Sequence, residues 1–136
     1  MKYSKALIVS IEEAQQLASH FESDYLESWH LLIAFSNYPY SVAGSVLNDY
    51  PLEVDHFEDA AFHVVGKSYN KKGKYKVLSF SHRLTSLFKE AEAVAEATHA
   101  KELGSEHLLY AIISDRGTLA TRILEFVGFS YEDKEG

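Results

Sequence analysis

Two groups of side chains in this sequence have types and spacings that suggest metal or phosphate chemistry. His56, Asp59 and His63 could share one helix face, but the histidines are seven residues apart, too far to chelate one ion tightly. Residues 61–68 come within one residue of a P-loop, yet Ala61 replaces the first glycine, which lets the backbone wrap a phosphate. We interpret both patterns as incidental. We expect no metal site, no cofactor in this chain and no enzyme.

A third group, Ser105, Glu106 and His107, is typical of a helix start. Ser105 is predicted to be the N-cap, because its hydroxyl can accept from backbone N–H groups that the first turn leaves unpaired. If this start converges with the helix start at Ser81, free N–H groups could bind an anion beside the Glu106 carboxylate, which could bind a cation. The alternative, which spacing alone favours, is that Ser105 and Glu106 only cap their own helix.

The elements that position these residues are duplicated. A shift of 77 residues, without a gap, superimposes Ser4 on Ser81, Leu7 on Leu84, Ala14 on Ala91, Leu26 on Leu103, and His30-Leu31-Leu32 on His107-Leu108-Leu109. The apolar periodicity stays in register, which indicates an internal repeat of one helical unit. His30 and His107 are therefore equivalent, and we expect each to make one hydrogen bond that fixes the start of its helix.

Apolar residues recur at helical spacing, so the sequence predicts an all-α protein. Capping residues and breaks predict helices over about residues 4–21, 28–36, 41–48 and 52–65, then from Ser81, Ser105, Thr118 and Ser130. We predict two tandem pseudo-symmetric four-helix repeats packed into one domain, with the last helix truncated. Residues 1–65 form repeat 1, residues 66–79 a basic linker and residues 80–136 repeat 2, in a fragment of a longer chain.

Charge is distributed unevenly along the chain. The net charge is −7, but residues 66–79 hold five lysines and no acidic residue, which leaves −12 for the remainder. An acidic body argues against nucleic-acid binding. The linker is either a basic docking strip for an acidic partner or a solvated connector, and we favour the connector. No apolar run approaches membrane-spanning length, and the absence of cysteine fits the cytosol.

The motifs of the second unit, with a worn copy in the first, resemble the Clp N-terminal repeat domain of Clp/Hsp100 AAA+ unfoldases, most closely the ClpC type of Gram-positive bacteria. They are Gly104-Ser105-Glu106-His107-Leu108-Leu109, Ala120-Thr121-Arg122-Ile123-Leu124 and Ser28-Trp29-His30-Leu31-Leu32. The resemblance implies a cytoplasmic, monomeric, non-catalytic domain that docks substrate proteins and an adaptor such as a MecA-like protein. It implies that ATP, magnesium and contact with the Clp protease belong to the parent protein. The alternative is a structural or regulatory cap of the ring without a ligand pocket.

The resemblance also implies site residues. ClpC-type members bind phosphorylated arginine through the Ser/Thr that opens the first helix of each repeat and the Glu of the G-[ST]-E-H motif. In the second repeat these residues are Ser81 and Glu106, with Arg83 also matching the pattern, so one site is expected there. In the first repeat Ser4 is present, but Trp29 replaces the glutamate. That pocket is therefore expected to be degenerate, although Trp29 could recover part of the lost energy by stacking on a guanidinium.

Overall fold

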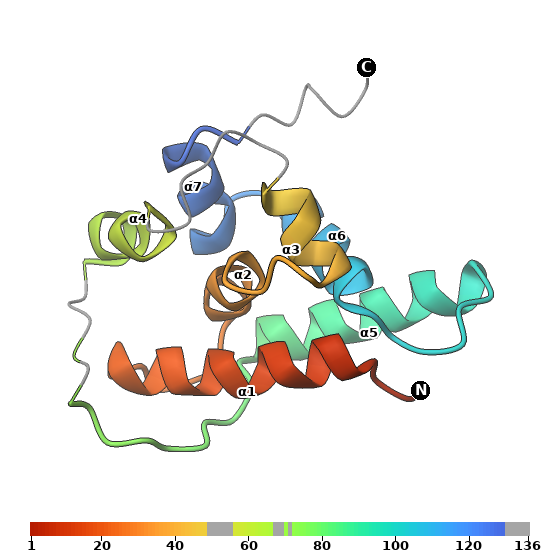
Figure 1. Ribbon diagram of the computed structural model, residues 1–136, viewed down its shortest axis with the longest axis horizontal. Helices are drawn as coiled ribbons and strands as arrows, with labels where there is room; N and C mark the ends of the chain where they lie inside the picture. Colours follow the sequence, from red (N-terminus) through yellow and green to blue (C-terminus); the bar gives the residue numbers. More distant parts are fainter. Residues whose placement is uncertain (49–55, 67–69, 71, 130–136) are drawn as a thin grey trace.

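The computed structural model describes residues 1–48, 56–66, 70 and 72–129, and its secondary structure there is helical (Figure 1). The helices are α1 (Lys5–His20), α2 (Ser28–Ser36), α3 (Val42–Asn48), α4 (His56–Val65), α5 (His82–Ala97), α6 (Ser105–Ser114) and α7 (Leu119–Phe126). The all-α prediction is confirmed. The helix expected from Ser130, and the first part of the one expected over 52–65, lie outside the described residues. No helix in the described part of the chain is both long and apolar enough to cross a membrane.

Side-chain caps begin α1, α5 and α7, as the sequence predicts. Each capping hydroxyl accepts from a backbone N–H three residues later, as the pairs Ser4–Leu7 (3.1 Å), Ser81–Leu84 (3.1 Å) and Thr118–Thr121 (3.3 Å) show. Such caps satisfy donors that the first turn of a helix leaves unpaired. The predicted cap of α3 is also present, since Ser41 Oγ accepts from the Gly44 N–H at 2.9 Å.

The long helices α1 and α5 also end in the same way. Glu22 and His99 lie 77 residues apart and both adopt the left-handed conformation, with φ of 54° and 59°. The next amide in each case, that of Ser23 or Ala100, donates to a carbonyl five residues earlier. This is a helix C-terminal motif in which glycine is the usual left-handed residue. Because the motif follows both α1 and α5, the duplication extends from the sequence to the backbone conformation.

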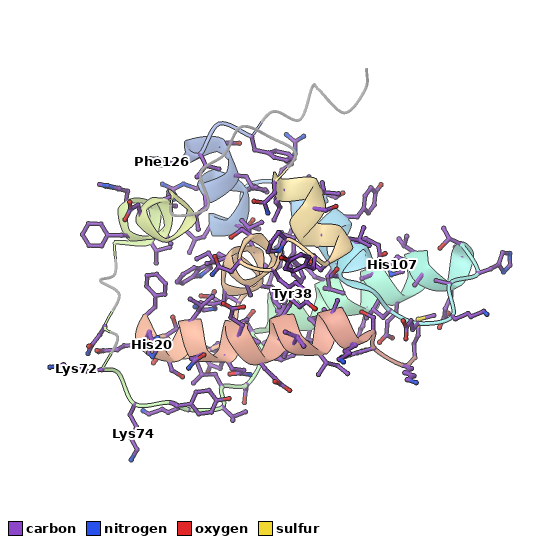
Figure 2. The ribbon with its side chains drawn as sticks, in the orientation of Figure 1. His20, Tyr38, Lys72, Lys74, His107 and Phe126 are labelled. Carbon is purple, nitrogen blue, oxygen red and sulfur yellow. The ribbon has the colours of Figure 1, made fainter. Side chains whose placement is uncertain are left out.

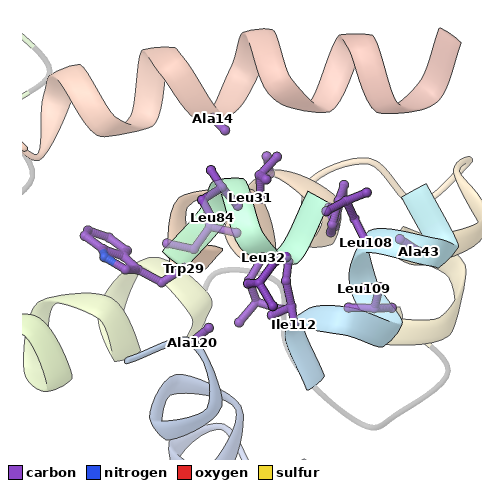
Figure 3. Packing of buried hydrophobic residues seen from close by; sticks show 14 of the residues in the cluster. Ala14, Trp29, Leu31, Leu32, Ala43, Leu84, Leu108, Leu109, Ile112 and Ala120 are labelled. Carbon is purple, nitrogen blue, oxygen red and sulfur yellow. The ribbon is translucent and has the colours of Figure 1, made fainter. Parts of the chain in front are cut away.

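Helix α2 occupies the centre of the core. All nine of its residues are buried, and Figure 1 shows it between α1 and α7. A helix that is apolar on all sides needs neighbours on all sides. Figure 3 shows Leu31 and Leu32 of α2 among Leu84 of α5 and Leu108 and Ile112 of α6. One hydrophobic core therefore serves both repeats.

Gly44 allows α3 to lie directly against the end of α2. A Cβ atom at this position would overlap the Tyr38 carbonyl oxygen and lie 2.7 Å from the Phe35 carbonyl oxygen. Both obstacles are backbone atoms, which cannot move aside as a flexible side chain can. The turn between the two helices therefore depends on glycine.

The segment of residues 72–79 is mostly exposed, but it is not a free connector. Gln15 of α1 bonds both backbone groups of Leu78, donating from Nε2 to the carbonyl oxygen (2.9 Å) and accepting the N–H at Oε1 (2.8 Å). Ser19 Oγ accepts the Lys76 N–H at 2.9 Å, and its proton faces the carbonyl oxygens of Gln15 (2.9 Å) and Lys76 (3.0 Å). Two side chains of α1 thus replace a neighbouring strand and hold this segment extended.

Candidate functional site

Two short backbone pairings join the repeats and place the candidate residues. Leu103 donates to the Lys2 carbonyl (2.7 Å) and accepts from the Ser4 N–H (2.8 Å). Leu26 donates to the Ser79 carbonyl (2.9 Å) and accepts from the Ser81 N–H (2.9 Å). The two pairings are related by the 77-residue shift. In each, the start of one repeat's first helix lies beside the start of the other repeat's second helix.

The first pairing borders a hollow of about 390 Å³, which we call hollow A. It is lined by the N-cap and first turn of α1, by α3, by the segment leading into α6 and by the first turn of α6. The lining residues are Ser4, Ala6, Val42, Ala100, Lys101, Glu102, Gly104, Ser105, Glu106 and His107. The Glu106 side chain is 43% exposed, and its Oε1 lies 3.8 Å from His107 Nδ1. The carboxylate lies so close to Gly104 that a Cβ there would overlap it. Hollow A thus carries acidic groups and one lysine beside the start of α1.

The second pairing borders a smaller hollow of about 280 Å³, hollow B. Its lining residues are Glu27, Ser28, Trp29, Ser81, Arg83, Gly117, Thr118 and Leu119. The guanidinium of Arg83 is already engaged, since Nε donates to Asp115 Oδ2 at 2.7 Å and Nη2 donates to Oδ1. This hydrogen bond is the main cause of a raised Arg83 pKa. Arg83 therefore faces hollow B as half of a bidentate ion pair.

The structure separates residues that the sequence interpretation grouped in one pocket. Ser81 and Arg83 line hollow B, whereas Glu106 lines hollow A with Ser4. The reason is that α5 and α6 pack as antiparallel neighbours, as the contact of Arg83 with Asp115 at the end of α6 shows. Since α5 has 16 residues, its start lies about 24 Å along its axis from the end that leads into α6. The two helix starts do not converge.

Trp29 is also placed differently from the expected stacking role. It is 2% exposed, packs edge-on against Phe21 with ring centroids 5.1 Å apart, and donates from Nε1 to Glu27 Oε2 at 3.1 Å. A buried indole cannot stack on a guanidinium that arrives from solvent. Trp29 and Ser4, expected together in a degenerate pocket, lie on different hollows.

The predicted cap of α6 is wrong by one residue. Gly104 is the N-cap, and Ser105 is the first helical residue. The hydroxyl of Ser105 instead accepts the Ala43 N–H at 3.3 Å, in the first turn of α3. Because the N–H groups of a first turn lack intrahelical partners, Ser105 satisfies a donor of the other repeat rather than of its own helix.

The two equivalent histidines fix helix starts, as predicted. His107 Nδ1 accepts from the Gly104 N–H and His30 Nδ1 from the Glu27 N–H, both at 2.9 Å. His30 is fully buried, and its Nε2 lies 2.9 Å from Ser23 Oγ. A capping histidine held in this way has a structural role. In the described part of the chain, no group of three or more His, Asp or Glu residues could hold a metal ion.

Sequence reasoning missed four charged residues at the hollows. Lys101 and Glu102 line hollow A, Glu27 lines hollow B, and Asp115 holds Arg83. Only the pairing of opposite repeats brings Lys101 beside Ser4, so local spacing carried no signal for it. Glu27 did have a sequence signal. In the degenerate motif of the first repeat it precedes Trp29 by two residues and keeps a carboxylate near the position where glutamate is missing.

Comparisons with known proteins agree with this fold. The family model of the Clp repeat (R) N-terminal domain matches residues 2–127. The N-terminal domain of ClpD from Arabidopsis thaliana superimposes with a TM-score of 0.78 at 16% identity, over 95% of this chain and 86% of that one. The Hsp104 N-terminal domain from Candida albicans gives 0.66 at 18% identity, over 96% and 94%. A ClpV N-domain solved in complex with a VipB peptide gives 0.73 at 22% identity, over 97% and 81%. No curated protein matches the sequence significantly.

Proposed function

Because the chain belongs to the Clp repeat N-terminal domain family, we propose that it docks substrate and adaptor proteins for a cytoplasmic AAA+ unfoldase. Domains of this family bind rather than catalyse. In this proposal the parent protein is of the ClpC type, carries the ATP and magnesium site, and contacts the Clp protease. The VipB peptide held by the ClpV N-domain supports a peptide partner for a domain of this fold.

Hollow A is the observation that carries the proposal. It combines the Glu106 carboxylate with the Lys101 ammonium at the start of α1, where Ser4 accepts a first-turn N–H. Anions are favoured at a helix start, because its unpaired N–H groups and dipole present partial positive charge. A ligand with a cationic and an anionic group therefore finds a complement for each.

Phosphoarginine is the ligand of this kind that we propose. Its guanidinium would pair with Glu106, and its phosphoryl group would lie toward Lys101 and the start of α1. Ala6 lies in hollow A at the position equivalent to Arg83, so Lys101 is the lining cation available to the phosphoryl group. This assignment replaces the grouping of Ser81, Arg83 and Glu106, which lie on two hollows.

Hollow B is expected to bind phosphoarginine weakly or not at all. Arg83 would have to leave Asp115 before it could bind a phosphoryl group, and Trp29 occupies the position of the missing glutamate. We therefore expect one site per chain.

Calorimetric titration with free phosphoarginine tests this assignment. The Glu106→Gln variant keeps the size of the side chain but loses the charge, so binding should weaken about tenfold to a hundredfold, as for one charge-assisted hydrogen bond. Glu27→Gln makes the same change in hollow B and should leave binding within about twofold. Circular dichroism checks that both variants fold. Equal losses in the two variants, or two equal sites in the parent domain, would contradict the assignment to hollow A.

A second assay separates docking from a passive role. The domain, coupled to a support, should retain a MecA-like adaptor or an unfolded model substrate whether or not phosphoarginine binds. Retention without phosphoarginine binding would leave protein docking as the function. If the domain retains neither protein and does not bind phosphoarginine, the alternative is favoured, namely a structural or regulatory cap of the unfoldase ring.

A further inference from the structure

The segment formed by residues 72–78, here called the strip, has one edge fixed and one edge open. Lys76 and Leu78 direct their backbone N–H and C=O groups toward Ser19 and Gln15 of α1. In an extended chain, alternate residues direct their hydrogen-bonding groups to the same edge. The groups of Tyr75 and Val77 therefore belong to the opposite edge, and no described residue bonds to them.

From residue 74 on, the side chains of the strip sort by charge in the same alternating way. Lys74 and Lys76 line one hollow of about 480 Å³ beside the end of α1, with Leu78 on the same side, and Lys72 lines it from the turn that precedes them. Figure 2 shows Lys72 and Lys74 directed away from the helices. On the alternate positions, Tyr75 is 53% exposed and Val77 is 77% exposed. One side of the strip is thus basic and the other apolar.

The basic side is not neutralised within the described structure. Its three lysines form no ion pair with a described residue. Two acidic residues, Glu22 and Asp24, also line the hollow, and Glu22 accepts from Asn70 Nδ2 at 3.0 Å. The lining therefore keeps an excess of positive charge on a chain whose net charge is −7.

We propose that the strip is a docking edge for an extended acidic segment of a partner protein, in which acidic and apolar residues alternate. The segment adds as a strand along the edge of Tyr75 and Val77, directing its acidic side chains toward the lysines and its apolar ones toward the other side. Strand addition supplies affinity through main-chain hydrogen bonds and selectivity through alternate side chains. This inference rests on the proposed docking function and assigns it a surface apart from hollows A and B.

Fluorescence anisotropy with a labelled peptide of alternating Glu and Val residues tests the proposal. The triple variant Lys72→Glu/Lys74→Glu/Lys76→Glu should bind about tenfold more weakly or worse, because each exposed ion pair contributes up to a few-fold. The matched variant Lys2→Glu/Lys5→Glu/Lys89→Glu changes three exposed lysines elsewhere, so it has the same net charge. It should bind within about twofold of the parent chain.

Three results would overturn the proposal: no binding of the alternating peptide, equal losses in the two triple variants, or undiminished binding of a peptide with N-methylated backbone amides. The last result would exclude main-chain pairing. The retention assay on the same variants distinguishes failure of the proposed docking edge from failure of the proposed function. If adaptor or unfolded protein is retained while the peptide does not bind, only the strip is excluded. If neither is captured, the docking function fails as well.

Discussion

Replacing Gln15 by alanine should release the segment that α1 holds. Gln15 is 6% exposed, and its amide makes two hydrogen bonds to Leu78, at 2.8 and 2.9 Å. Each intramolecular hydrogen bond contributes about 0.5–1.5 kcal/mol, so Gln15→Ala should lower the free energy of unfolding by roughly 2 kcal/mol. For a domain of this size the melting temperature should fall by roughly 8 °C.

Hydrogen exchange locates the effect. The Leu78 amide loses its acceptor in Gln15→Ala and should exchange about tenfold faster or more, because a local opening no longer breaks that bond. The Lys76 amide keeps Ser19 as its acceptor and should change less. Gln15→Glu gives an intermediate case, since a carboxylate can accept the Leu78 N–H but cannot donate to the carbonyl oxygen.

The adjacent Gln16→Ala is the matched control for Gln15→Ala. Gln16 is exposed, so the same chemical change on the same helix should alter stability by less than about 0.5 kcal/mol. If Gln15→Ala behaved like Gln16→Ala in urea denaturation, and the Leu78 amide kept its protection, the account of a segment fastened by α1 would be refuted.

Four further substitutions test the packing and the ionisation of single residues. Gly44→Ala should lower the free energy of unfolding by about 3 kcal/mol, because the new Cβ would overlap backbone atoms. Gly117 has open space around it but a φ of 83°, so Gly117→Ala should lower the free energy of unfolding by only about 1 kcal/mol in the same denaturation assay. Ser10→Ala should leave the melting temperature unchanged or raise it, since Ser10 Oγ is buried and no described residue forms a hydrogen bond with it. Burial raises the pKa of Tyr3 above 10.0. The contribution of the neutral phenol to the free energy of unfolding is therefore fully present below pH 10 and is lost as the pH rises through the raised pKa. Tyr3→Phe should remove this alkaline loss when the free energy of unfolding is measured against pH.

Local sequence signals predicted local structure well. The hydroxyls of Ser4 and Ser81 cap the helices that their positions indicate, and the equivalent histidines His30 and His107 hold helix starts. These features depend on residues within one turn of each other. Ser105 is the exception. Glycine can also be an N-cap, so Gly104 takes that position, and the Ser105 hydroxyl accepts the N–H of Ala43 from the other repeat. Its partner lies 62 residues away, where no local pattern could indicate it.

The composition of the hollows depends on how the repeats pack, and the sequence could not reveal it. A repeat read alone suggests that Ser81 and Glu106 belong together, because both carry the family motifs of one unit. Because α5 and α6 are antiparallel, the helix starts at Ser81 and Glu106 lie far apart. The neighbour of each start comes from the other repeat. The fastening of residues 76 and 78 was missed for a similar reason, since Gln15 and Ser19 have no unusual spacing and act only through tertiary contact.

If hollow A binds a ligand as proposed, that binding depends on the integrity of the whole domain, because the hollow combines helix starts from both repeats. Hollow A takes Ser4 from one repeat and Glu106 from the other, and the Leu103 backbone pairing lies between them. A ligand that touches both sides can bind only while the repeats are packed together. Binding to the folded form alone must then raise the unfolding free energy, by about 2.7 kcal/mol when the ligand is at a hundred times its dissociation constant. A site built within one repeat would need no such packing, so separating the repeats would leave its affinity intact.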